Sequence, residues 1–114
     1  MARSIRYLVR NTHGTTRQNF NWPGVITARS VVHVTAAEVG VGTTQAHPTP
    51  PVQDFFYNLG AAPVWVSNIG PHKNEFTTDP GGVEYLLHVE WNSPLNVAVT
   101  ITVEDALPVE IQGF

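Results

Sequence analysis

Residues 96–105 read Asn-Val-Ala-Val-Thr-Ile-Thr-Val-Glu-Asp, and they are the clearest indication of the fold class in the chain. Its odd positions from 97 to 103 are β-branched aliphatic residues, and its even positions are polar or small. Side chains of a strand alternate between two faces, so this period of two predicts a strand with one buried face. Residues 83–91 show the same period, and their expected inward residues are Tyr85, Leu87, Val89 and Trp91.

The rest of the chain predicts more short strands and no helix. Turn-forming Gly, Pro, Asn and Thr residues separate the candidate segments, which are 4–11, 24–28, 30–36, 54–59, 63–69 and 108–112. Residues 43–51 hold three prolines within four positions and are expected to form a surface connection. With 114 residues, the chain fits one domain over residues 1–114. We therefore expect an all-β, two-sheet antiparallel β-sandwich of seven or eight strands, either a jelly roll or immunoglobulin-like.

The two clearest strands restrict how they can be connected. Both turn their odd residues inward, so a direct hairpin with a four-residue loop at 92–95 would place apolar and polar residues on one face. Either the loop is odd in length, or a bulge intervenes, or the strands belong to opposite sheets. The expected core comprises Trp65, Tyr85, Leu87, Trp91, Val97, Val99 and Ile101.

Composition excludes several classes of protein. There is no cysteine, so a disulfide scaffold, a thiolate metal site and a cysteine nucleophile are all excluded. The chain has neither an apolar run long enough for a membrane span nor an apolar start typical of a secretory signal. Synthesis in the cytoplasm is therefore expected. The protein could then associate with a particle such as a virion, or it could be released without a secretory signal. No nucleophile elbow or nucleotide-binding glycine loop is present, so the sequence predicts a protein that is not an enzyme and needs no cofactor.

Charge is divided unevenly along the chain. Residues 1–29 hold all five arginines and no acidic residue, whereas the remainder holds Lys73 and all nine acidic residues. The basic segment could pair with acidic strands of its own sheet, or it could meet an acidic surface on a neighbouring copy. Nucleic-acid binding is disfavoured, because five arginines are few and an acidic body would repel phosphate. The expected interface residues are Arg3, Arg6, Arg10, Arg17, Phe20 and Phe114.

A second group of residues suggests sugar binding. The segment 18–24 places Phe20 and Trp22 among amides in an expected loop, and an aromatic platform with amide side chains suits a sugar ring. The residues of this hypothetical site are Asn19, Asn21, Trp22, His72 and Asn74. Two other interpretations of the aromatic pair stay open: that it fills one end of the core, or that it anchors a neighbouring subunit.

Histidine provides the only candidates for metal binding. His33 and His88 each lie in a predicted strand, and they could form a metal site if those strands were neighbours. Surface positions without a metal are the alternative.

The sequence thus predicts first a structural protein that forms homo-oligomers or docks on a larger particle, as a virion decoration or coat subunit does. A lectin-like protein is the alternative, and a metal-binding domain is a weaker one. Neither nucleic acid nor membrane is an expected partner.

Overall fold

The computed structural model describes residues 2–41, 55–57, 59–108 and 110–113. The predicted surface connection at 43–51, part of the predicted strand 54–59 and the interface candidate Phe114 lie outside these residues. The described part of the chain is all-β and holds seven strands. They are β1 (Arg3–Thr12), β2 (Gly14–Asn21), β3 (Val31–Val41), β4 (Phe55–Tyr57), β5 (Val64–His72), β6 (Gly82–Val89) and β7 (Leu95–Glu104).

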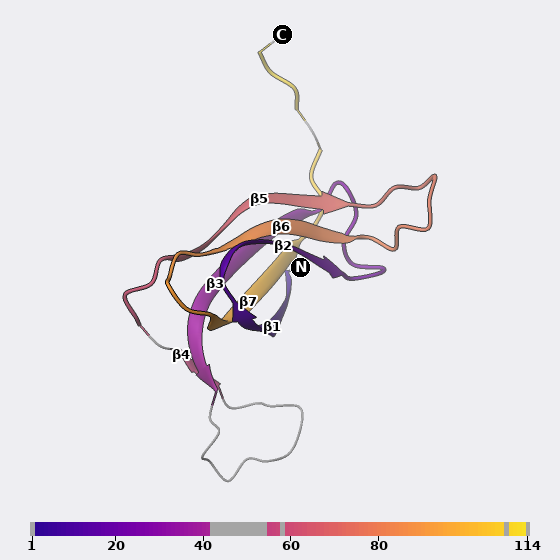
Figure 1. The fold of residues 1–114 in the computed structure, drawn as a ribbon. Helices are drawn as coiled ribbons and strands as arrows, with labels where there is room; N and C mark the ends of the chain where they lie inside the picture. Colours follow the sequence, from indigo (N-terminus) through magenta and orange to yellow (C-terminus); the bar gives the residue numbers. More distant parts are fainter. Residues whose placement is uncertain (1, 42–54, 58, 109, 114) are drawn as a thin grey trace, which may run out of the picture.

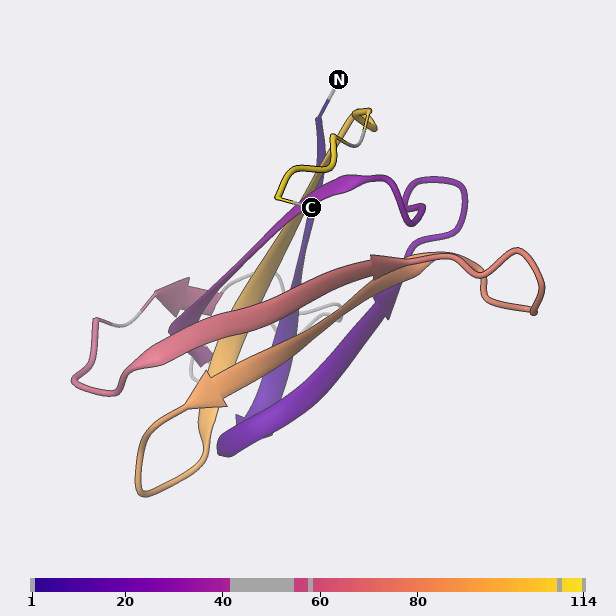
Figure 2. The same cartoon turned by 90° about the horizontal axis from the view of Figure 1, so that it is seen from above.

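The strands form the predicted antiparallel β-sandwich. One sheet has the order β1-β7-β3-β4 and the other the order β2-β6-β5. Figures 1 and 2 show the two sheets lying face to face, with their strands crossing at an angle. The first strand pairs with the last, and the second pairs with the sixth in the opposite sheet. This nested pairing agrees with a jelly roll rather than with the immunoglobulin order, in which the first two strands are neighbours.

The chain changes sheets at a sharp bend between β1 and β2. Only His13 separates the two strands, and the backbone turns through positive φ angles of 50° at Asn11 and 71° at Gly14. Residues 90–94 carry the chain from β6 to β7 in the other sheet. Of the three connections that parity allowed, the placement of these strands in opposite sheets is therefore the correct one.

The core lies between the sheets and comes mainly from the two strands that the sequence shows most clearly. Tyr85, Leu87 and Val89 of β6 are buried, as are the four odd residues from 97 to 103 in β7. Towards the β1–β2 side, the hydroxyl of Tyr7 makes a hydrogen bond with that of Tyr85, and the Tyr7 ring stacks on Phe20 at 5.2 Å. The alternation read from the sequence thus places this part of the core correctly.

Two tryptophans expected in the core lie outside it. Trp65 is 44% exposed and Trp91 is 42% exposed. Trp65 stands on the outer face of β5, where it pairs with His88, because Val64 and Val66 occupy the inward positions. Trp91 follows the end of β6, where the regular alternation of faces no longer applies.

Three segments differ from the predicted elements. Residues 24–28 form turns instead of a strand, with both Val25 and Ile26 donating to the carbonyl of Trp22, yet Ile26 is fully buried. Most of the expected loop 18–24 belongs to β2, whose inward residues include Gln18, so hydropathy does not reveal its alternation. The described residues of 108–112 form no strand and are exposed. No helix among the described residues is long and apolar enough to cross a bilayer.

Candidate functional site

Four of the five arginines in residues 1–29 lie on two edge strands of the sandwich. Strand β1 is an edge strand of the four-stranded sheet, and β2 is an edge strand of the three-stranded sheet. Together they carry the arginines predicted for an interface, which are Arg3, Arg6, Arg10 and Arg17. We call these two strands the basic edge. An edge strand leaves half of its backbone N–H and C=O groups without a sheet partner, so it can accept another strand.

Among the residues that the structure describes, few contacts neutralise the basic edge. Arg17 donates from Nη2 to Glu84 Oε2 at 2.6 Å, which is a solvent-exposed pair of the kind that stabilises by about 0–1 kcal/mol. Arg6 donates from Nε to Thr100 Oγ1 at 2.8 Å, and its guanidinium lies 5.3 Å from the ring centre of Tyr57. Within the described ranges, Arg3 and Arg10 make no ion pair with a carboxylate. Pairing with acidic strands of the same sandwich thus accounts for Arg17 but not for these two.

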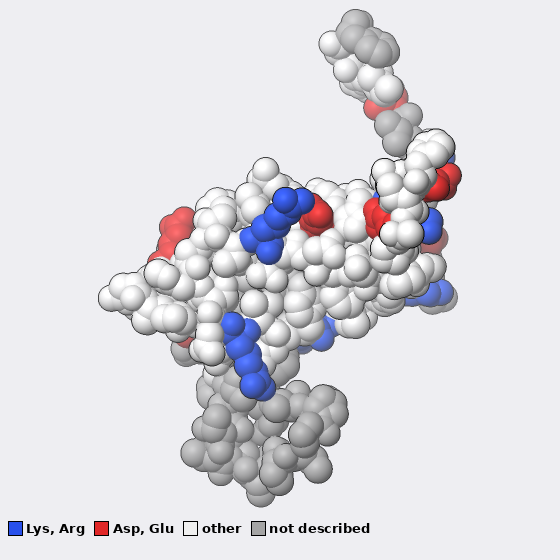
Figure 3. All heavy atoms as spheres, turned by 45° about the vertical axis from the view of Figure 1, so that its right-hand side comes forward, with Lys and Arg blue, Asp and Glu red and all other residues white. Residues whose placement is uncertain are grey.

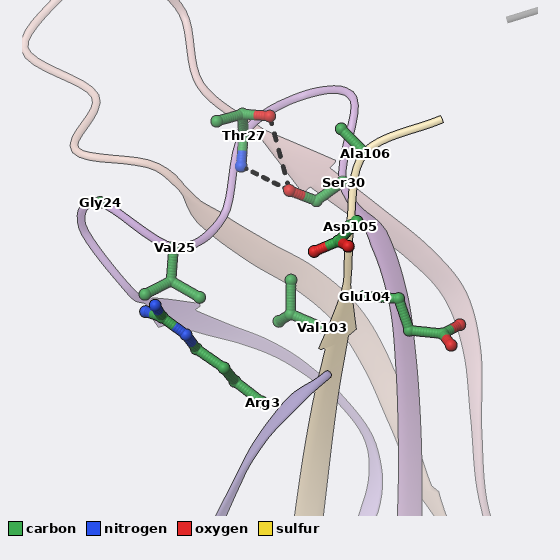
Figure 4. A pocket seen from close by; sticks show the side chains of 9 residues that line it. All are labelled: Arg3, Gly24, Val25, Thr27, Ser30, Val103, Glu104, Asp105 and Ala106. Atoms are coloured by element: carbon green, nitrogen blue, oxygen red, sulfur yellow. Dashed lines mark hydrogen bonds between the residues drawn. The ribbon is translucent and has the colours of Figure 1, made fainter. Parts of the chain in front are cut away.

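A cleft of about 480 Å³ lies where β1 begins and β7 ends. It is lined by Arg3, Gly24, Val25, Thr27, Ser30, Val103, Glu104, Asp105 and Ala106. Figure 4 shows Arg3 reaching towards Gly24 and Val25, while Glu104 points away on the opposite side. Glu104 Oε2 accepts from His33 Nε2 at 2.7 Å, and the backbone N–H of Thr27 donates to Ser30 Oγ at 2.9 Å. The start of the basic edge and the end of β7 therefore share this cleft.

The chain leaves the sandwich from this cleft as an extended segment. We call its described residues, 105–108 and 110–113, the C-terminal arm. In Figures 1 and 3 the arm projects away from the two sheets. All of its described residues are exposed, including Leu107 at 59% and Ile111 at 65%. Figure 3 also shows basic and acidic side chains spread over the visible face of the body and an acidic side chain along the arm.

A polar network holds the turn between β5 and β6 against β2. His72 Nδ1 lies 2.8 Å from Asp79 Oδ2, and its Nε2 lies 2.7 Å from Asn19 Oδ1. The backbone N–H groups of Gly81 and Asn74 donate to the two carboxylate oxygens of Asp79 at 2.9 and 3.0 Å. These hydrogen bonds, from the Gly81 N–H first and from His72 next, lower the pKa of Asp79 from 3.8 to about 2.

We expect this network to make stability sensitive to acid. Because the pKa of Asp79 is lower in the folded state, its contribution is present above pH 4 and is lost as the pH falls towards 2. Urea denaturation of the wild type and of Asp79→Asn at pH 6 and pH 3 measures this contribution. The wild type should lose more stability between the two pH values than the variant does. Equal losses would show that Asp79 does not carry the effect.

The same network accounts for most of the proposed sugar-binding residues. Asn19, Asn21 and His72 come together, since Asn19 Nδ2 also donates to Asn21 Oδ1 at 2.8 Å, and Asn74 joins them through Asp79. Trp22 is half-buried against the core, and its ring and that of Phe20 are in an edge-to-face arrangement with centroids 6.1 Å apart. Phe20 is half-buried in the same cluster, so both aromatic side chains pack against the core.

A second polar and aromatic group lies on the outer face of the β2-β6-β5 sheet. The Trp65 indole stacks on the His88 imidazole with centroids 3.8 Å apart, and Trp65 Nε1 donates to Glu90 Oε1 at 3.2 Å. His88 Nε2 lies 2.7 Å from Ser67 Oγ, and its Nδ1 lies 3.0 Å from Thr15 Oγ1. A serine–histidine contact is one part of a nucleophilic site, but here a threonine hydroxyl stands where a carboxylate would orient the histidine. Sequence reasoning missed this group, because its members come from three strands whose neighbours are set by the topology.

The metal site considered for His33 and His88 does not form. His33 belongs to β3 in the four-stranded sheet and His88 to β6 in the three-stranded sheet. Both point outward, so the whole thickness of the sandwich separates them. Among the described residues, no group of three or more His, Cys, Asp or Glu side chains is placed to hold a metal ion.

Comparison of the chain with protein-family models, with curated proteins and with solved structures gave no match. The function must therefore be inferred from the geometry of the basic edge, the C-terminal arm and the outer face of the smaller sheet.

Proposed function

We propose that this protein is a non-enzymatic structural subunit that associates with copies of itself through its basic edge. The observation that carries the proposal is that β1 and β2 are edge strands, on which Arg3 and Arg10 make no ion pair with a carboxylate of the described residues. The ten-residue strand β1 is a long edge to leave uncovered, and such edges pair readily with other chains. Docking of the same edge on a larger particle, as a virion decoration or coat subunit does, is another form of the proposal.

The division of charge favours one mode of association. Two basic edges repel each other, so direct pairing of β1 with β1 of another copy is disfavoured. All nine acidic residues follow residue 29, and a basic edge meeting an acidic surface of another copy brings opposite charges together. Such complementarity steers encounter and fixes orientation, and it weakens with salt.

The test is the mass in solution measured by analytical ultracentrifugation over a range of protein concentrations. We expect oligomers at low salt that dissociate as the salt rises to about 0.5 M, where the Debye length is only a few ångströms. The double variant Arg3→Glu/Arg10→Glu should weaken association by about tenfold or more, which corresponds to about 1.4 kcal/mol. The matched control is Arg29→Glu, an exposed arginine in the turns before β3 rather than on the basic edge. A protein that stays monomeric at every concentration would overturn the proposal.

Sugar binding is a second candidate, and the position of Trp65 favours it. One face of the indole is covered by His88, and the hydrogen bond to Glu90 fixes its orientation, while 44% of the residue remains exposed. A fixed indole next to a carboxylate is a suitable platform for a sugar ring. We expect Trp65→Ala to abolish binding to any glycan found on an array, and the equally exposed Trp91→Ala to retain it. An array without binding would exclude this candidate.

A further inference from the structure

We propose that the C-terminal arm of one copy adds as a strand to β1 of a second copy. This inference rests on the proposed self-association and names the segments that make the contact. The donor is the arm described above, and the acceptor is β1, one of the two edge strands of the four-stranded sheet. The two segments have complementary patterns of apolar and charged residues.

The arm has the residue pattern of a strand but no sheet to join. Over residues 107–112 the odd positions are aliphatic, and the even positions are Pro108, Glu110 and Gln112. In the structure Leu107 and Ile111 face solvent, and no described residue of the arm is paired in a sheet. Two large aliphatic side chains exposed on one extended segment are explained if the segment is covered in the assembled state.

Strand β1 offers the matching pattern on its free edge. Its inward residues Ile5, Tyr7 and Val9 pack against the core but are only half-buried, because no strand lies beyond them. The outward positions on either side of Leu8 are Arg6 and Arg10, both exposed. A strand added here would cover the aliphatic residues on its inner face and face arginines on its outer face.

The shared period of two makes these matches occur together. If Glu110 lies opposite Arg6 or Arg10, then Leu107 and Ile111 fall on the inner face beside the half-buried residues of β1. Pro108 has no N–H group and has the same parity as Glu110, so its nitrogen can point away from β1 at the new edge of the sheet. From Leu107 to Gly113 the arm reaches about 23 Å when extended, which is enough to cover much of the ten-residue strand.

A second copy is a better acceptor than the arm's own body. The arm leaves the sandwich at the end where β1 begins, so it would have to run parallel to its own β1. Parallel pairs are less stable per residue than antiparallel pairs, and a second copy can present β1 in the antiparallel direction. Strand β2 is a weaker acceptor, since its one arginine already pairs with Glu84.

The experiment combines mass measurement with amide hydrogen exchange on the full chain. In the wild type, the backbone amides of the arm and of β1 should become protected from hydrogen exchange together. This should happen as the protein concentration rises above the dissociation constant of the oligomer. The variant Leu107→Asp/Ile111→Asp should weaken association by about tenfold or more and leave the arm unprotected. The control Gln112→Asp adds a negative charge to the same segment at an outward position, on the face that meets the arginines of β1, and should associate at least as strongly as the wild type does. Because all three positions are exposed, each variant should keep the thermal midpoint of the monomer.

The outcomes separate this inference from the proposed function. Association of Leu107→Asp/Ile111→Asp at wild-type strength overturns the role of the arm and leaves self-association in place. Protection of the arm in dilute monomer means that it pairs within its own chain, which also overturns the inference. A wild type that stays monomeric at every concentration overturns both.

Discussion

Gly81→Ala should destabilise the fold by about 3 kcal/mol or more, as measured by urea denaturation. Gly81 has a φ of +94°, which side-chain-bearing residues rarely adopt, and a Cβ added there would lie 2.3 Å from the carbonyl oxygen of Ile26. Its own backbone joins two connections, because its N–H donates to Asp79 and its carbonyl accepts from the N–H of Trp22 at 2.9 Å. The backbone at Gly81 cannot move away without breaking these hydrogen bonds, and the backbone at Ile26 cannot move away without displacing the fully buried Ile26 side chain.

Gly24→Ala is the matched control for this prediction. Gly24 also has a positive φ, of +77°, but no atom lies within 4 Å of a Cβ added there. It should therefore show only the conformational cost of a left-handed residue, about 1–2 kcal/mol. The difference between the two variants measures the steric conflict between the β5–β6 turn and the segment before β3. Equal losses would show that this contact does not hold the two connections together.

Leu87→Ala should lower the free energy of unfolding by about 2–5 kcal/mol. Leu87 is fully buried in β6, the central strand of its sheet, between Thr16 on β2 and Val66 on β5. Removing the methine carbon and the two methyl carbons there leaves a cavity that neighbours on both sides prevent from closing. Urea denaturation at neutral pH measures the loss.

Leu86→Ala is the control, since it makes the same chemical change one residue earlier on the outer face of the strand. Leu86 is half-buried and borders solvent, so its replacement should cost less than about 1 kcal/mol. A loss at position 86 equal to that at position 87 would contradict the assignment of the two faces. This pair of variants tests the alternation from which the sandwich was predicted.

Some elements of the fold could be read from local sequence, and others could not. Strands β6 and β7 were predictable because each puts apolar residues on one face and mostly polar residues on the other. Strand β2 was missed because the inward face of this edge strand includes Thr16 and Gln18, so the difference in polarity between its faces is small. Residues 108–112 have a strand pattern, but a strand exists only where another strand supplies hydrogen bonds.

Some features of the candidate site could likewise be predicted from the sequence, and others could not. The concentration of arginines in residues 1–29 is visible in the sequence, and so is the aliphatic alternation of the C-terminal arm. That β1 is an edge strand depends on which strands stand beside it, and that order is a long-range property. The other contacts are also long-range. Trp65 and His88, which stack, are 23 positions apart in the sequence, and His72 and Asn19, which are in contact, are 53 positions apart.

Local sequence is enough to predict that most of the chain forms strands with one buried face, and that its charges are divided between a basic beginning and an acidic remainder. These properties are local, because the side-chain period and the composition of a segment do not depend on its neighbours. The positions of the basic strands at the sheet edges, and of the described arm residues outside the sandwich, depend on the tertiary structure. Strand order is set by hydrogen bonds and packing between distant segments, and these form only when the whole chain folds.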